Sequence, residues 1–112
     1  MQRGAEIDVQ KSDGVTALMR AAIGGRERVV ELLLQRDAEI NLQKSDGGTA
    51  LMLAAINGHE RMVELLLQRG ADANLQNSIG FTALMFAAGS AHERAIELLL
   101  QCSADANLQD SA

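Results

Sequence analysis

The sequence predicts an all-α fold, a helical solenoid of short stacked helices, and two observations support this prediction. The first is composition: the 112 residues include 18 alanines and 16 leucines, but 2 phenylalanines and no tryptophan, tyrosine or proline. Alanine and leucine favour helices, and the residues that favour sheets are scarce, which argues against a β-sandwich or barrel. The second is a repeat, because the sequence matches itself when it is shifted by 33 residues.

This repeat sets the expected domain organisation. Residues 13–45 match residues 46–78 at 24 of 33 positions, and residues 46–78 match residues 79–111 at 22 of 33 positions. We therefore expect one domain, residues 1–112, in which residues 1–12 are the tail of a preceding repeat and three full repeats follow. A unit of two short helices cannot bury its apolar face alone, whereas stacked units share a continuous core.

Each repeat carries signals for two helices and two turns. In the second repeat, Thr49 occupies the N-cap position of a first helix that reaches Ile56, and Gly58 permits a left-handed stop. A second helix is expected over residues 60–68, which carry a wide apolar stripe, and the chain leaves it at Gly70. The matching N-cap and exit positions in the other repeats are Thr16, Thr82, Asp37 and Ser103.

These residues resemble ankyrin repeats over essentially the whole chain. The family pattern is close to D-G-x-T-P-L-H-L-A-A-x-x-G-H-x-E-V-V-x-L-L-L-x-x-G-A-D-V-N. The second repeat reads Asp46-Gly47-Gly48-Thr49-Ala50-Leu51-Met52-Leu53-Ala54-Ala55, then Gly58-His59, Met62-Val63-Glu64-Leu65-Leu66-Leu67 and Gly70-Ala71-Asp72-Ala73-Asn74. The resemblance implies a curved solenoid with short β-hairpin or turn fingers. It also implies that the chain binds proteins through the fingers and the concave face of the first helices.

The third repeat departs from this pattern. Gly89-Ser90-Ala91-His92 stands where the second repeat has Ile-Asn-Gly-His. Alanine is disfavoured in the left-handed backbone that glycine adopts readily, so the sequence does not predict a regular turn between the helices of this repeat.

Charge and cysteine content argue against several classes of function. The formal net charge is −5, and no basic stripe with interleaved aromatic residues is present, so we expect no nucleic-acid partner. No apolar run approaches the ~18 residues of a membrane span, so we expect no membrane association. Cys102 is the single cysteine, which rules out an intrachain disulfide and favours an intracellular, cytoplasmic protein.

No constellation of residues predicts catalysis or metal binding. His59 and His92 occupy equivalent positions of repeats whose helices stack about 8–10 Å apart, too far to share one metal ion. Cys102 has no histidine near it in the repeat register and is not expected to act as a nucleophile. Glutamates and arginines recur at equivalent helical positions, as on a solvated surface. We therefore expect no enzyme, no catalytic residue, no metal and no cofactor.

The candidate binding residues lie at exposed positions where the repeats differ, because core positions must repeat with every interface. Gly48 is expected to leave a hollow between the apolar flanks Val15 and Phe81, into which a partner could insert a side chain. The alternative is that these apolar side chains are partly buried against the neighbouring finger. The candidate residues are Val15, Ile23, Asp46, Gly48, Ile56, Asn57, Ile79 and Phe81.

The sequence favours a non-enzymatic module that binds a protein partner. The alternative is a structural spacer, or a consensus-like engineered repeat scaffold, with no partner of its own; the high identity between repeats favours this reading. Apolar end faces around Val29 and around residues 96–100 also predict end-to-end self-association, because a solenoid requires polar outer faces on its terminal repeats.

Overall fold

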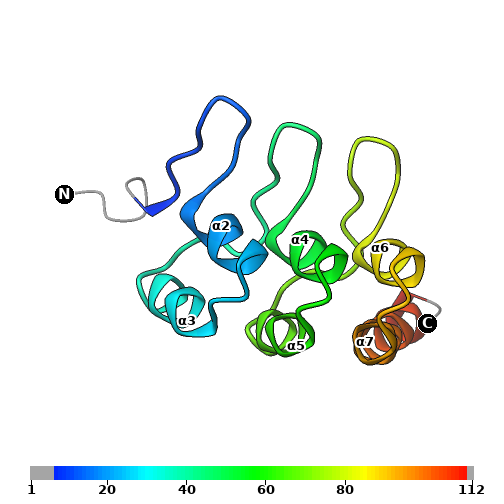
Figure 1. Cartoon of the computed structure of the whole chain (residues 1–112). Helices are drawn as coiled ribbons and strands as arrows, with labels where there is room; N and C mark the ends of the chain where they lie inside the picture. Colours follow the sequence, from blue (N-terminus) through cyan, green and yellow to red (C-terminus); the bar gives the residue numbers. More distant parts are fainter. Residues whose placement is uncertain (1–6, 111–112) are drawn as a thin grey trace.

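The computed structural model describes residues 7–110, with side chains described for residues 7–102. Within these residues the chain forms six helices and no strand. The helices come in three pairs, one pair in each predicted repeat (Figure 1). The pairs are α2 (Ala17–Ile23) with α3 (Glu27–Gln35), α4 (Ala50–Ile56) with α5 (Glu60–Gln68), and α6 (Ala83–Gly89) with α7 (Glu93–Asp110).

The helices form two rows, so the predicted helical solenoid is confirmed. The first helices α2, α4 and α6 lie side by side in one row, and the second helices α3, α5 and α7 form the other (Figure 1). Each helix packs on its equivalent in the next repeat and on the partner within its own pair. The loops that precede the first helices all project from the same side of the solenoid (Figure 1).

One apolar core runs through all three repeats. The first helices stack through small side chains, and Ala22, Ala54 and Ala87 are completely buried. Larger residues such as Leu51 and Leu66 fill the space between the two rows, and both are at most 2% exposed. Burying one leucine side chain contributes about 1.5–3 kcal/mol. Part of this burial requires a neighbouring repeat, because helices of successive repeats pack on one another as well as within each pair.

The predicted N-caps are confirmed in all three repeats. The hydroxyl oxygens of Thr16 and Thr49 are buried and accept hydrogen bonds at 3.2 Å from the third residue of the helix that follows. The hydroxyl oxygen of Thr82, which is half-buried, accepts the equivalent bond at 3.4 Å. Each threonine satisfies a backbone N–H that has no partner within the first helical turn, which fixes where the helix begins.

The turn inside each helix pair is left-handed. Gly25 has a φ of 68° and Gly58 a φ of 70°, and Ala91 adopts the same geometry with a φ of 57°. The third turn is therefore regular, although the sequence does not predict it. A residue with a Cβ costs about 1–2 kcal/mol in this region of backbone space, so Ala91 is a strained position.

Helix α7 is much longer than the other second helices. α3 and α5 end just before the left-handed residues Asp37 (φ 70°) and Gly70 (φ 93°). The sequence predicts the equivalent exit at Ser103, and this prediction is wrong because α7 continues through Ser103 to Asp110. Serine has neither the freedom of glycine nor the tolerance of aspartate for left-handed backbone, so the right-handed helix continues.

The projecting loops are turns. We name them finger 1 (residues 10–15), finger 2 (residues 43–48) and finger 3 (residues 76–81). Each is closed by a backbone hydrogen bond across its base, which in finger 2 runs from the Lys44 N–H to the Gly48 carbonyl oxygen at 2.8 Å. No residue described in the fingers is in a strand, so the β-hairpin part of the prediction is not confirmed.

Replacing Ala91 by glycine is expected to stabilise the fold, because the change removes a Cβ from left-handed backbone. The free energy of unfolding should rise by about 0.5–1 kcal/mol, since the greater freedom of glycine in the unfolded chain offsets part of the relief. Urea denaturation followed by circular dichroism measures this change.

The matched control is Gly58→Ala, the reverse change at the equivalent position. It should be strongly destabilising, because a Cβ at Gly58 would collide with the imidazole of His92. If A91G left stability unchanged, the third turn would not be left-handed in solution.

Candidate functional site

Backbone hydrogen bonds connect each finger to the next. The N–H of Ser45 donates to the carbonyl oxygen of Asp13 at 2.9 Å, and the N–H of Ser78 donates to that of Asp46 at 2.8 Å. The two bonds are equivalent, because each runs from the serine of one finger to the aspartate of the preceding finger. They fix the spacing between fingers independently of the helix rows beneath.

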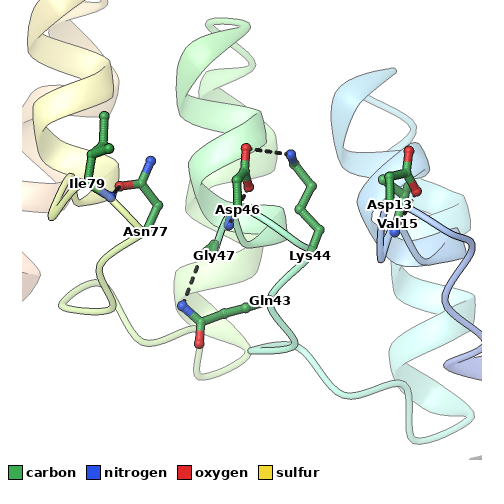
Figure 2. A network of polar contacts seen from close by, with 9 residues as sticks. Asp13, Val15, Gln43, Lys44, Asp46, Gly47, Asn77 and Ile79 are labelled. Atoms are coloured by element: carbon green, nitrogen blue, oxygen red, sulfur yellow. Dashed lines mark hydrogen bonds and ion pairs between the residues drawn. The ribbon is translucent and has the colours of Figure 1, made fainter.

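A glutamine in finger 2 adds a second connection of the same kind. The side-chain amide of Gln43 donates to the Gly47 carbonyl oxygen in its own finger (Figure 2) and to the Gln76 carbonyl oxygen in finger 3, at 2.9 and 3.0 Å. Gly47 has a φ of 86°, and a Cβ there would lie 2.7 Å from the Cα of Asn77. Only glycine allows the fingers to approach this closely.

A charged pair covers the tip of finger 2. The carboxylate of Asp46 accepts a hydrogen bond from the Lys44 ammonium at 2.8 Å (Figure 2) and another from the Gly48 N–H at 2.9 Å. The Lys44 ammonium, and to a lesser degree the Gly48 N–H, hold the pKa of Asp46 below its ordinary value. Because the Asp46 side chain is 58% exposed, this pair contributes at most a few tenths of a kcal/mol to stability.

The hollow predicted at Gly48 is wrong. Gly48 is buried, and a Cβ built on it would lie 3.1 Å from the Asp46 carboxylate and 3.2 Å from the Lys44 side chain. These two side chains fill the space that the missing side chain leaves. The prediction failed because it assumed that a glycine leaves a hollow, and it did not consider neighbours that fold over the same finger.

Six of the eight candidate binding residues are exposed. Val15 is an exception, because it is half-buried and packs against the core, as in the alternative that the sequence left open. Gly48 is the other. The exposed apolar candidates are Ile23 at 40%, Ile56 at 39%, Ile79 at 71% and Phe81 at 40%, and the exposed polar candidates are Asp46 and Asn57.

Finger 3 exposes two large apolar side chains, Ile79 and Phe81, and its backbone is hydrogen-bonded by a different side chain than in fingers 1 and 2. In fingers 1 and 2, the aspartates at the tip accept a hydrogen bond from the N–H two residues later. Finger 3 has Ile79 at that position, and Asn77 takes over the role. Its side-chain oxygen accepts from the N–H groups of Ile79 (Figure 2) and Phe81 at 3.1 and 2.9 Å.

Finger 3 also contacts the first helix of its own repeat. The rings of Phe81 and Phe86 lie 5.4 Å apart between centroids, with a tilt of 53° between their planes. This tilted geometry is favourable for an aromatic pair. The apolar surface of Ile79 and Phe81 therefore continues onto the half-buried Phe86 of α6. Neither Asn77 nor Phe86 is among the candidate residues predicted from the sequence. The tendency of asparagine to accept bonds from following N–H groups was the signal for the first.

The histidines have structural contacts. The Nε2 atom of His59 lies 2.7 Å from the carbonyl oxygen of Ile23, so this ring links the second repeat to the end of α2. Within the part of the chain that the structure describes, no group of His, Cys, Asp and Glu side chains is arranged to hold a metal ion. No helix among the described residues is both long enough and apolar enough to cross a membrane.

Comparison with protein families identifies a repeat family. The family model described as ankyrin repeats (3 copies) matches residues 1–77 and residues 37–110, which together include almost the whole chain. None of the curated proteins matches the chain.

Replacing Lys44 by glutamine is expected to raise the pKa of Asp46 toward its ordinary value. The ammonium favours the charged carboxylate, so the pair stabilises the fold at neutral pH and this small contribution is lost as the pH falls through the folded-state pKa of Asp46. Nuclear magnetic resonance of the carboxyl carbon against pH measures the shift. The equivalent change in finger 1, Lys11→Gln, should leave Asp46 unaffected. An Asp46 titration that K44Q did not alter would mean that the pair does not persist in solution.

Proposed function

This chain belongs to the ankyrin-repeat family, and on that basis we propose that it binds a protein partner through finger 3 and the neighbouring first helices. Ankyrin repeats are generally protein–protein interaction modules. The surface that we propose combines Ile79 and Phe81 on finger 3 with Ile56 and Asn57 at the end of α4.

The observation that carries this proposal is the exposure of Ile79 and Phe81 on a finger whose backbone is held in place. Large apolar side chains that are exposed together commonly mark an interaction surface. The Asn77 side chain accepts hydrogen bonds from two backbone N–H groups of the finger, and the Phe86 ring packs against the Phe81 ring. A surface that is already ordered loses little conformational entropy on binding, which favours affinity.

The fingers differ in character along the solenoid. Fingers 1 and 2 each place a lysine and an aspartate near the tip, whereas finger 3 has Asn77 and Ile79 at the equivalent positions. This change from charged to apolar finger tips favours a partner that inserts an apolar side chain beside finger 3 and presents polar groups to finger 2. Aromatic residues often dominate the binding energy of such surfaces, so we assign the main contact to Phe81.

We further propose that the chain has no enzymatic activity and works in the cytoplasm. Among the residues whose side chains are described, Cys102 is half-buried and the histidines pack between repeats, which supports this proposal. A lone cysteine also suits a compartment in which thiols remain reduced.

The alternative is a spacer or scaffold without a partner. The high identity between repeats favours this alternative, because a repeat that serves only as a spacer needs no surface residues that differ from those of the other repeats. It does not account for the replacement of aspartate by Ile79 at the tip of finger 3, which exposes apolar surface and contributes nothing to the stacking of the repeats.

The test is capture of partners by the immobilised chain, followed by affinity measurement with purified variants. Phe81→Ala should weaken binding of the captured partner by about 1–3 kcal/mol, within the range of interface hot spots. The same change should reduce the free energy of unfolding by about 1 kcal/mol or more, because the ring also packs on Phe86. Affinity is therefore measured on variants whose helix content by circular dichroism equals that of the unaltered chain.

Val9→Ala is the matched control. Val9 is an apolar residue that is 61% exposed and lies before finger 1, away from the proposed surface. This variant should bind the partner as the unaltered chain does. Equal affinities for F81A and V9A would place the binding surface elsewhere, and failure to capture any partner above background would favour the spacer.

A further inference from the structure

Equivalent residues in the three repeats are covered to different extents at the C-terminal end of the solenoid. Met19 and Met52 are 1% and 2% exposed, whereas the equivalent Met85 is 48% exposed. Leu100, whose equivalents are half-buried, is 50% exposed. In repeats 1 and 2 these positions are covered by the repeat that follows. We call the surface around Met85 and Leu100 the C-terminal face.

The opposite end shows the complementary pattern. Val29 is 41% exposed, whereas the equivalent Met62 and Ala95 are 1% and 0% exposed. Leu32 is 43% exposed and its equivalents are half-buried. In repeats 2 and 3 these positions are covered by the preceding repeat. We call the surface around Val29 and Leu32 the N-terminal face.

We propose that the C-terminal face of one molecule stacks on the N-terminal face of a second copy, so that the solenoid continues from molecule to molecule. The contact would repeat the packing of α2 and α3 on α4 and α5, and of α4 and α5 on α6 and α7, which the chain already makes twice. The occupant of each face is therefore a surface that this chain itself carries. This inference is independent of the proposed partner at finger 3.

The ion pairs between repeats give the contact a direction. Within the chain, glutamates of one repeat pair with arginines of the next across the second helices, at distances of 3.7 to 3.8 Å. In every case the carboxylate belongs to the earlier repeat. The pairs are Glu27 with Arg61, Glu31 with Arg69, and Glu64 with Arg94.

The same register continues at the two ends of the molecule. The C-terminal face carries Glu93 and Glu97, which are equivalent to Glu27 and Glu31. The second copy would meet them with arginines, since Arg28 and Arg36 are equivalent to Arg61 and Arg69. Two C-terminal faces brought together would instead oppose glutamates with glutamates. Charge complementarity therefore favours head-to-tail stacking over a symmetric dimer.

A steric feature also matches across the proposed contact. Between repeats, the imidazole of the later repeat packs over the left-handed glycine of the earlier one, with no room for a Cβ at Gly58 and little at Gly25. The third repeat has a Cβ at this position, in Ala91. The second copy would bring no imidazole there, because Arg26 occupies the histidine position in its first repeat. At the proposed contact, Ala91 therefore replaces the glycine and Arg26 of the second copy replaces the histidine. The flexible arginine side chain can move aside from the Ala91 methyl group.

The second copy also carries the segment that links successive repeats. In repeats 1 and 2 the chain leaves the second helix and builds the finger that follows, through residues 40–45 and 73–78. At the end of repeat 3, α7 continues to Asp110 and does not build this segment. The second copy supplies the equivalent residues itself, as residues 7–12.

Sedimentation of the full chain under reducing conditions, from micromolar to millimolar concentration, tests the proposal. The weight-average mass should rise with concentration and pass that of a dimer, because a head-to-tail contact leaves one free face at each end. Met85→Glu and Val29→Glu should each weaken association about tenfold or more, because each buries an unpaired carboxylate in the contact. Gln68→Glu adds the same charge in the middle of the solenoid, on an exposed position of α5, and should associate like the unaltered chain.

A mixture of the two face variants distinguishes this arrangement from a symmetric dimer. V29E keeps an intact C-terminal face, and M85E keeps an intact N-terminal face. Their equimolar mixture should therefore form dimers of one molecule of each and grow no further. Circular dichroism of each variant establishes folding, and Leu32→Glu and Leu100→Glu replace any variant that does not fold.

Three results would overturn the proposal. The unaltered chain could stay monomeric at millimolar concentration, which would mean that the faces do not recognise each other. Association could depend on Met85 and not on Val29, which would indicate that two C-terminal faces pair symmetrically. Association could also occur only in a parallel run without a reducing agent, which would identify a disulfide through Cys102 as its cause.

Discussion

The whole structure depends on one interface, the stacking of a helix pair on its copy 33 residues later. Because the first helices meet through alanines such as Ala54 and Ala55, neighbouring first helices approach closely, and larger residues fill the space between the two rows. The second repeat is covered on both sides within the molecule, and its Leu51 and Met52 are almost completely buried. The first and third repeats each have one neighbour, and each exposes apolar side chains on the side that has none.

Polar contacts between repeats add specificity to this apolar interface. The side-chain oxygen of Asn41 accepts from the N–H of Asp72 in the next repeat at 2.9 Å, and Asp8 accepts in the same way from Glu39. His59 reaches the carbonyl oxygen at the end of α2. Among the residues that the structure describes, no buried side-chain nitrogen or oxygen lacks a hydrogen-bond partner. A repeat that slipped relative to its neighbour would lose all of these bonds together, so the fingers keep a fixed spacing.

The sequence predicted what local rules and the repeat period control. Thr49 at the helix start and Gly58 at the turn depend on backbone groups within a few residues, and both predictions are confirmed. The hollow at Gly48 and the exposure of Val15 depend on how side chains fold over one another, which spacing along the chain does not specify. The exit predicted at Ser103 failed for another reason, since a position equivalent to glycine does not ensure a left-handed turn when the residue there disfavours left-handed backbone.

The packing of an imidazole over a glycine at each repeat junction has a consequence for how such a chain can be rearranged. The three helix pairs look interchangeable, but the junctions are not. His92 leaves no room for a Cβ at the left-handed position of the repeat before it, His59 leaves little, and Ala91 carries a Cβ at this position. A gene in which the third repeat were duplicated in tandem would place His92 of the new copy against the Ala91 methyl group. Duplication of the second repeat would create a junction with glycine on one side and histidine on the other. Growth of this array by recombination is therefore expected to be tolerated in its middle and resisted at its C-terminal repeat.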